Sequence, residues 1–291
     1  MKKYRIGIIG TENSHAHGFT RIINKPDENG NFRYPDCHVT LVWGHYPESN
    51  EQVVNEFDAD KVAESIEEML ENVDAVMITA RDGKFHYEFA EPFIKAGIPV
   101  FVDKPFTVDS KEAIALVELA KEKQVPICGG SVLKFVDGIQ EMKKRVAEIG
   151  DKFISGALVA PLVLNSPYSG FFFYASHLVE MTLEIYGYNP KSVTASRNGE
   201  NVCAIISYEG FNVTNHFNNE SGGYYGAIYG KNGFSEHTEF NLDGSTELEC
   251  DDFVRMLRNG EMSLDYEKYM VPVFVMNAIK ESYETGKTVN L

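Results

Sequence analysis

The spacing of apolar residues divides the chain into two parts with different patterns. Up to about residue 128, short apolar runs alternate with segments whose apolar residues recur at helical spacing. The runs predict buried strands at residues 5–9, 39–43, 75–79, 98–102 and 125–128. The segments between them predict helices at residues 17–23, 49–57, 62–70, 87–95 and 110–123. Strictly alternating strands and helices are typical of a doubly wound parallel sheet, so we predict an α/β fold for this part.

The pattern changes after Gly129-Gly130, where longer β-like segments replace the alternation. Helices are predicted at residues 138–149, 177–186, 253–257 and 271–284. Strands are predicted at residues 153–163, 192–195, 202–208, 212–217, 224–229 and 236–241. Regular helical crossovers are missing, so this sheet should be antiparallel or mixed. We therefore predict two domains, residues 1–128 and residues 129–291.

Composition and charge exclude several classes of partner. The chain has 43% hydrophobic residues, which is enough for a substantial core, and a formal net charge of −16. Such an acidic balance opposes binding to nucleic acid or to anionic membranes. The cysteines are far apart and form no metal-type spacing, which favours an intracellular protein with reduced thiols. Met1-Lys2-Lys3 and the short apolar run after it do not form a signal peptide, so we predict a cytoplasmic protein without a membrane span.

Lys104 is the first candidate for chemistry. It follows the apolar run 98–102 and precedes Pro105, which cannot continue a sheet ladder and disfavours helix at the residue before it. The chain must therefore leave the sheet at Lys104, with the ammonium at the carboxyl end of the strand. In open α/β sheets the ligand crevice lies at that edge. The alternative is a solvated surface lysine that happens to precede a turn.

The loop after the first strand, Gly10-Thr11-Glu12-Asn13-Ser14-His15, has the context of a dinucleotide-binding turn. The G-x-G-x-x-G fingerprint beginning at Gly10 would require glycine where Glu12 and His15 stand. A carboxylate at position 12 would face phosphate charge, so the loop binds a nucleotide differently or does not bind one. Asn13 or Ser14 can cap the following helix and leave an anion site of backbone N–H groups. We interpret His15 and His17 as packed or capping residues and not as metal ligands.

The next strand ends offer less specific signals. The second strand ends at Trp43-Gly44-His45-Tyr46, with neither an acid for an adenosine ribose nor an arginine for a 2′-phosphate. His45 or Tyr46 can stack on adenine, and an ordinary strand end is an equal alternative. The third ends at Thr79-Ala80-Arg81-Asp82, followed by His86. Arg81 can meet a phosphate or a substrate carboxylate, or pair with Asp82.

A predicted helix carries the last motif, in which His177 and Glu180 stand three residues apart behind a run of aromatic residues. This spacing places both side chains on one helix face. An imidazole oriented by a carboxylate is suited to general-base catalysis near neutral pH. The alternative is a buried histidine whose hydrogen bonds are satisfied by its neighbour.

Taken in order, these motifs resemble the glucose–fructose oxidoreductase/inositol dehydrogenase (Gfo/Idh/MocA) family over nearly the whole chain. The resemblance is carried by residues 6–10, 73–79 with His86, 96–100, Asp103-Lys104-Pro105, His177 with Glu180, and 281–287. It implies a Rossmann domain followed by an α+β domain whose large, mainly antiparallel open sheet often mediates oligomers. It also implies NAD(P)-dependent hydride transfer at a carbon of a sugar or cyclitol.

The resemblance also implies roles for individual residues. His177 would take the hydroxyl proton, and Lys104 would hydrogen-bond the reacting oxygen and stabilise its developing negative charge. Tyr174 and Glu180 are supporting candidates for substrate contact or orientation. The second domain also offers possible polar contacts, which are Lys134, Asn215, His216, Tyr224, Tyr225 and His237. Cofactor contacts would come from Gly10, Thr11, Glu12, Asn13, Ser14, His15, Ala80, Asp82, His86 and Asp103. The implied partners are a sugar-like small molecule and further copies of the chain, as a homodimer or homotetramer, with no nucleic acid and no membrane.

The sequence departs from the family pattern at several positions and leaves alternatives open. Glu12 and His15 replace glycines, the acid after the second strand is missing, and Phe173 replaces the family's catalytic aspartate. A non-catalytic ligand-binding or regulatory relative with a decayed nucleotide site is therefore the second hypothesis. A metal-assisted lyase or hydrolase using the histidines is a third. The choice between NAD and NADP also stays open.

Overall fold

The computed structural model describes residues 3–291, so Met1 and Lys2, which enter the prediction about a signal peptide, lie outside the described residues. Within residues 3–291, no helix is long and apolar enough to cross a membrane. The chain divides into two compact units. The first comprises the residues up to Thr107, Lys111–Gly130 and Thr246–Glu267, and the second comprises Val108–Ser110, Ser131–Ser245 and Lys268–Leu291.

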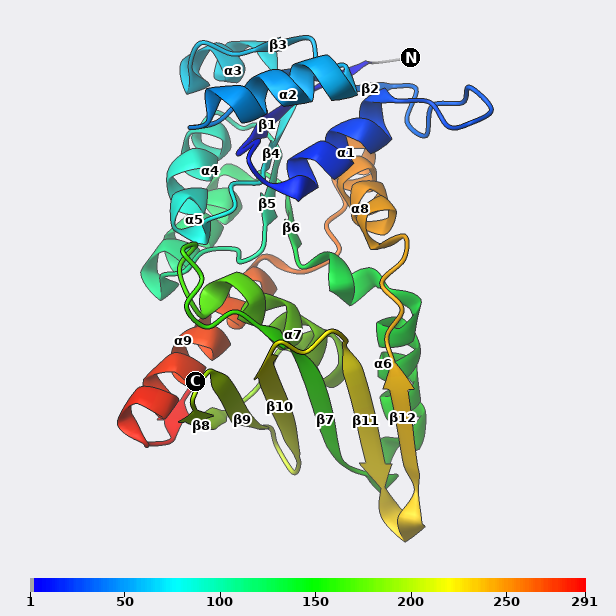
Figure 1. The fold of residues 1–291 in the computed structure, drawn as a ribbon, viewed down its shortest axis with the longest axis vertical. Helices are drawn as coiled ribbons and strands as arrows, with labels where there is room; N and C mark the ends of the chain where they lie inside the picture. The colour runs from blue at the N-terminus through cyan, green and yellow to red at the C-terminus, as the bar shows by residue number, and fades with distance from the viewer. Residues whose placement is uncertain (1–2) are drawn as a thin grey trace. The chain divides into compact units, whose positions relative to one another are not determined.

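The first unit is built on a parallel sheet with the strand order β3-β2-β1-β4-β5-β6 (Figure 1). The strands are β1 (Tyr4–Ile9), β2 (Cys37–Trp43), β3 (Lys61–Val62), β4 (Ala75–Ile78), β5 (Val100–Asp103) and β6 (Ile127–Gly130). The predicted doubly wound parallel sheet is confirmed. The strand order reverses between β1 and β4, which is the switch point where such sheets bind ligands. Val62 was predicted to open a helix, but it lies in β3 because it pairs with Val42 of β2.

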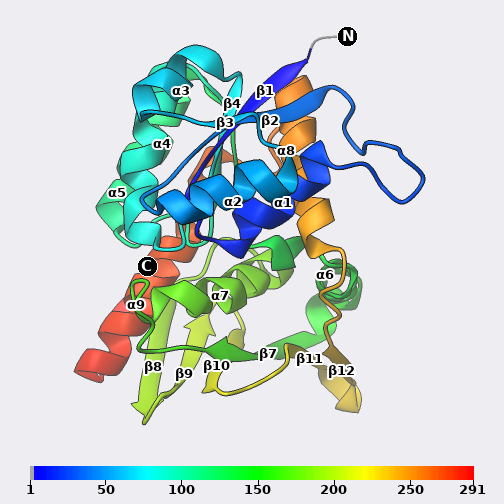
Figure 2. The ribbon, with the colours of Figure 1, turned by 45° about the horizontal axis from the view of Figure 1, so that its top comes forward.

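Helices cover both faces of this sheet (Figure 2). They are α1 (Ser14–Asn24), α2 (Pro47–Phe57), α3 (Ile66–Asn72), α4 (His86–Lys95), α5 (Ser110–Lys123) and α8 (Ser245–Asn259). The predicted boundary at residue 128 assigns all of α8 to the second domain. In the structure, α8 belongs to the first unit from Thr246 onwards. Phe253 of α8 packs edge-on against Phe101 of β5, with ring centroids 6.1 Å apart. The chain therefore returns to the first unit because α8 supplies apolar side chains to its core.

The second unit contains a sheet with the strand order β12-β11-β7-β10-β9-β8-β13. The strands are β7 (Phe153–Leu162), β8 (Ser192–Asn198), β9 (Asn201–Ser207), β10 (Asn212–Asn219), β11 (Tyr225–Gly230), β12 (Ser235–Glu239) and β13 (Val289–Asn290). Only β7 and β10 pair in parallel among the described strands of this sheet. The predicted mainly antiparallel sheet is therefore confirmed.

One face of this second sheet carries helices and the other is open (Figure 1). The covering helices are α6 (Asp137–Ile149), α7 (Phe172–Tyr186) and α9 (Val271–Thr285). In α7 every residue from Ala175 to Tyr186 is buried. The polar side chains of a helix that is buried all round depend on partners inside the protein, because water cannot reach them. His177 and Glu180 have such partners in the hydrogen-bond network described below.

Candidate functional site

The loop after β1 is pressed against the end of β4. Gly10 has a φ of +99°, and a Cβ on it would lie 2.1 Å from the backbone nitrogen of Ala80, so only glycine fits. Thr11 is buried and donates to Oδ1 of Asn50 at 2.5 Å. Of the two capping candidates, Asn13 caps α1, because its side chain accepts the N–H of His15. Ser14 is the exposed first residue of that helix.

Glu12 links this loop to the end of β4. Its carboxylate accepts a hydrogen bond from the backbone N–H of Arg81 at 2.9 Å. The link joins the carboxyl ends of β1 and β4, between which the strand order reverses. A negative charge therefore stands at the place where a dinucleotide's phosphates lie in folds of this kind.

Asp103 organises the end of β5. It is fully buried, and its Oδ2 lies 2.8 Å from Nδ1 of His15 and 3.1 Å from Nδ2 of Asn13. Its Oδ1 accepts the backbone N–H of Lys104 at 2.7 Å. Burial would raise the pKa of Asp103, but the charge and hydrogen bond of His15 and the charges of Lys104 and His86 hold this pKa below its usual value. His15, which stands at the position of the fingerprint's third glycine, thus packs against the carboxylate of Asp103.

Lys104 is not a solvated surface lysine, since only 6% of it is exposed. The turn that carries it is held by His86, whose Nδ1 lies 2.7 Å from the carbonyl oxygen of Pro105. The other ring nitrogen, Nε2, lies 2.7 Å from the carbonyl oxygen of Ala80. Both contacts are with acceptors, so His86 satisfies them only as an imidazolium that donates twice. His86 therefore clamps the Lys104 turn to the end of β4.

An aromatic cluster lies after β2, at the position where the sequence lacks a ribose-binding acid. The exposed His45 packs edge-on against Phe85, with ring centroids 5.1 Å apart, and Phe85 stacks on Phe89 at 5.7 Å. Trp43 packs edge-on against Phe89, with ring centroids 5.6 Å apart. Asp82, on the same edge of the sheet, forms an ion pair with Lys84.

The groups at the carboxyl edge of the first sheet fit a nicotinamide dinucleotide, with one exception. The N-terminus of α1 and the exposed Ser14 suit a phosphate, because helix N-termini present N–H groups to anions. The partly exposed rings after β2 suit a flat base. Glu12 is the exception, because its carboxylate would repel phosphate charge. No group of His, Cys, Asp and Glu in residues 3–291 is arranged to hold a metal ion.

In the second unit, a buried network forms around His177. Nδ1 of His177 lies 2.7 Å from Oγ of Ser131. The backbone N–H of Ser131 donates to Oε2 of Glu180 at 2.8 Å, and the same oxygen lies 3.6 Å from Nζ of Lys134. All of these residues are buried. Ser131 thus connects the two residues of the predicted motif, because it contacts Nδ1 of His177 and donates its backbone N–H to Glu180.

Sequence reasoning missed Ser131. It follows β6 directly, after Gly129 and Gly130, and its hydroxyl caps a short 3-10 helix, Val132–Phe135, by accepting the N–H of Leu133 at 3.2 Å. The available signal was its place at the carboxyl end of a strand, on the same edge of the fold as Lys104. Its partner His177 is 46 residues away in the chain, and no local pattern reports a contact over that separation.

Aromatic rings flank His177. The ring centroids of Tyr174 and Tyr224 lie 6.1 and 6.4 Å from that of the imidazole. Burial raises the pKa of Tyr224 well above its usual value, so its hydroxyl stays protonated at neutral pH. Phe173, which stands where the family has its aspartate, packs against Tyr168 and Tyr174. An apolar contact therefore replaces a charged one at this position.

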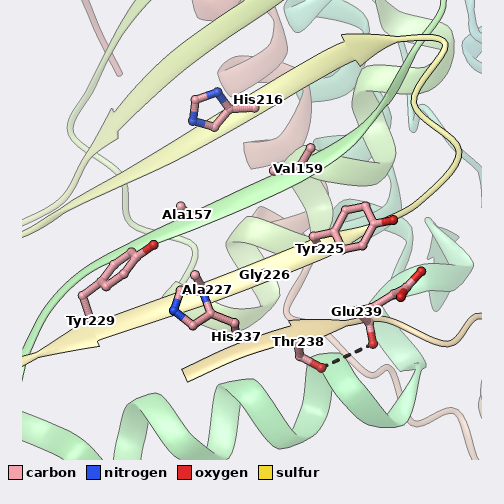
Figure 3. Close-up of a pocket in the computed structure, with 10 residues that line it drawn as sticks. All are labelled: Ala157, Val159, His216, Tyr225, Gly226, Ala227, Tyr229, His237, Thr238 and Glu239. Carbon is pink, nitrogen blue, oxygen red and sulfur yellow. Dashed lines mark hydrogen bonds between the residues drawn. The ribbon is translucent and has the colours of Figure 1, made fainter. Parts of the chain in front are cut away.

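Other polar residues of the second sheet belong to different surroundings. Asn215 is buried and exchanges hydrogen bonds with Thr182 of α7. His216, the next residue, points to the opposite face of the strand. There it lines a hollow on the open face of the sheet together with Tyr225 and His237 (Figure 3). These side chains do not join the group around His177.

Comparison with known proteins shows which proteins the chain is similar to. Residues 4–130 match the Gfo/Idh/MocA family model, described as an oxidoreductase family with an NAD-binding Rossmann fold. The match shows that this part of the chain is similar to the oxidoreductases of that family. The chain is 32% identical to UDP-N-acetylglucosamine 3-dehydrogenase of Acidithiobacillus ferrooxidans over 80 aligned residues. These residues make up 28% of this chain and 25% of that protein. The chain spans only 25% to 42% of the length of the curated relatives that it matches first.

Solved structures of similar fold cover the whole chain. GenD2 from gentamicin A biosynthesis, in complex with NAD, has a TM-score of 0.84 at 13% identity, over 100% of this chain and 97% of that one. Scyllo-inositol dehydrogenase of Lactobacillus casei, with bound NAD(H) and scyllo-inositol, has a TM-score of 0.82 at 16% identity, over 99% of both chains. At these identities the likeness establishes the fold of both units.

Proposed function

We propose that the chain is an NAD(P)-dependent oxidoreductase that transfers hydride between a nicotinamide cofactor and a CH–OH group of a sugar or cyclitol. The observation that carries this proposal is the buried Lys104, held at the ligand edge of a sheet that is similar to an NAD-binding family. Similar proteins support the substrate class, since those named above act on a nucleotide sugar or bind scyllo-inositol.

The proposal gives individual residues of the chain the following roles. The bound nicotinamide would accept or donate the hydride. Lys104 donates a hydrogen bond from Nζ to the reacting oxygen and stabilises the negative charge that develops there. His177 is the second group proposed to act on that oxygen, and Tyr174 contacts the substrate beside it. Glu180 and Lys134 hold Ser131 and its partner His177 in place, which is a narrower role than direct substrate contact.

The cofactor edge would use the N-terminus of α1 with Ser14 for the phosphates and the rings after β2 for the base. The end of β2 carries neither a ribose-binding acid nor an arginine for a 2′-phosphate. We therefore propose that contact with the aromatic rings contributes to binding of the adenosine half. NAD is the first cofactor to test, because both similar structures named above contain it.

The test is turnover of inositols and hexoses with NAD+ or NADP+, followed by nicotinamide absorbance. Lys104→Ala and His177→Ala should lower kcat at least a hundredfold, about the contribution of one positioned proton-transfer group. NAD(H) affinity should stay nearly unchanged in His177→Ala, measured by nicotinamide fluorescence. His237→Ala, in the hollow on the open sheet face, serves as the control with unchanged activity. Full activity of both catalytic variants would refute these assignments.

The second candidate is a non-catalytic ligand-binding relative, favoured by the carboxylate of Glu12 at the switch point and by Phe173. Titration with NAD(H) and NADP(H) separates the two candidates. Binding weaker than about 1 mM corresponds to less than about 4 kcal/mol of affinity. That result, together with no turnover of any polyol, would favour the non-catalytic reading.

We also propose that copies of the chain associate through the open face of the second sheet. Tyr225 and Tyr229 are exposed there and line the hollow in Figure 3, and Ile205 of β9 is exposed as well. Large exposed apolar side chains grouped on one sheet face are typical of subunit interfaces. Sedimentation equilibrium should show an oligomer, and Ile205→Glu with Tyr229→Glu should shift it towards monomer. A monomeric wild type would refute the assembly.

A further inference from the structure

The hydrogen bonds of the Ser131 hydroxyl determine where His177 carries its proton. Ser131 is fully buried. Its Oγ accepts the N–H of Leu133 at 3.2 Å and lies 2.7 Å from Nδ1 of His177. Within residues 3–291, these are the hydrogen-bond contacts of this oxygen.

A serine hydroxyl has one hydrogen to donate and two lone pairs to accept with. Leu133 uses one lone pair, so the hydrogen has Nδ1 of His177 as its acceptor. In the reverse arrangement, Nδ1–H would donate to Oγ, and the hydroxyl hydrogen would be buried without a partner. Buried donors of this kind are rare because they lose water without a replacement. The satisfied arrangement is therefore donation from Ser131 to Nδ1.

The position of the hydroxyl is itself fixed. Glu180 accepts the backbone N–H of Ser131 at 2.8 Å, and the ammonium of Lys134 lies 3.6 Å from the same carboxylate oxygen. The backbone of Ser131 is thus anchored to α7, the helix that carries His177. Loss of the hydroxyl would leave this anchor in place, because the anchor uses the main chain.

On the basis of the proposed function, we propose that Ser131 is a positioning residue that holds neutral His177 with its hydrogen on Nε2. Nε2–H then donates a hydrogen bond to the substrate oxygen and cannot accept the hydroxyl proton. This reverses the role that the family resemblance implies for His177.

The direct test is nuclear magnetic resonance of protein labelled with 15N at histidine. Two-bond nitrogen–proton correlations show which ring nitrogen is protonated, and His177→Gln assigns the signal. We expect Nε2–H in the wild type and in Ser131→Thr, and loss of that single tautomer in Ser131→Ala. The matched control is Ser176→Ala, which removes the neighbouring buried hydroxyl, one without a hydrogen-bond partner in the described residues. Nδ1–H in the wild type would overturn the inference.

Kinetics provide the second readout and separate this inference from the proposed function. Ser131→Ala should lower kcat about tenfold to a hundredfold with little change in KM, as loss of a histidine-orienting partner does elsewhere. Ser131→Thr should restore most of the activity, and Ser176→Ala should match the wild type. Unchanged kcat in Ser131→Ala would overturn the inference. If no polyol is turned over but Nε2–H is found, the tautomer stands and the proposed function fails.

Discussion

The carboxylate of Glu12 accepts the backbone N–H of Arg81 at 2.9 Å, and this contact joins two strand ends across the switch point of the sheet. In the G-x-G-x-x-G fingerprint, a glycine at this position lets the backbone approach a pyrophosphate. Here a side chain occupies the position and brings a negative charge. His15, at the third glycine position, turns instead to Asp103. The two departures therefore differ in consequence: His15 braces the loop, whereas Glu12 opposes an anionic ligand.

We expect Glu12→Gln to tighten NAD(H) binding, because the amide can still accept the N–H of Arg81 without a negative charge. The gain should be about 1 kcal/mol, the interaction of two unit charges about 4 Å apart in water. Nicotinamide fluorescence titration measures it, and the gain should shrink at high salt. Glu56→Gln, at an exposed position on α2, is the control. Weaker binding by Glu12→Gln would show that the carboxylate contacts the ligand favourably.

Asp103 should make stability depend on pH in the acid range. Its pKa is lowered in the folded protein, so its contribution is present above the unfolded pKa of about 3.9 and is lost as pH falls through the folded value. Urea unfolding of wild type and Asp103→Asn between pH 3 and 7 measures this contribution. The difference in unfolding free energy between the two proteins should narrow below about pH 4. A constant difference across this range would contradict the lowered pKa.

His86→Gln should lower the free energy of unfolding by about 1–3 kcal/mol, because glutamine cannot donate to the carbonyls of both Ala80 and Pro105 in the same geometry. Urea denaturation at neutral pH measures the change. His38→Gln provides a matched control, since His38 is partly exposed and pairs with the exposed Asp60. Equal stability of the His86→Gln protein and the wild type would mean that the two ring contacts are not both made.

Phe253→Ala tests the assignment of α8 to the first unit. The side chain is fully buried against Phe101, so its loss should lower the free energy of unfolding by about 3–5 kcal/mol. The destabilised transition should be that of the unit containing Trp43, the single tryptophan of the chain, whose fluorescence reports it. Leu248→Ala, at a more exposed position of the same helix, should change stability much less. A loss of stability confined to the second unit would contradict the assignment of α8 to the first.

The sequence by itself determined the longer elements and both sheet types. Apolar runs and helical spacing are local signals, and the positions of β1, β2, β4, β5 and β6 follow from them to within a few residues, whereas the two-residue β3 does not. Pro105 likewise placed Lys104 at a strand end, because its effect on the backbone is local. The family resemblance added the class of chemistry, since its motifs are short stretches of sequence.

Only the tertiary structure decided which side chains meet. Ser131 and His177 are 46 residues apart, and Glu12 and Arg81 are 69 residues apart, so their contacts depend on strand order and on how helices pack over the sheets. The return of α8 to the first unit has the same origin, because an amphipathic pattern shows that a helix has a buried face but not which core receives it. Local spacing thus set the elements, while long-range packing set the partners that fix the proton on His177.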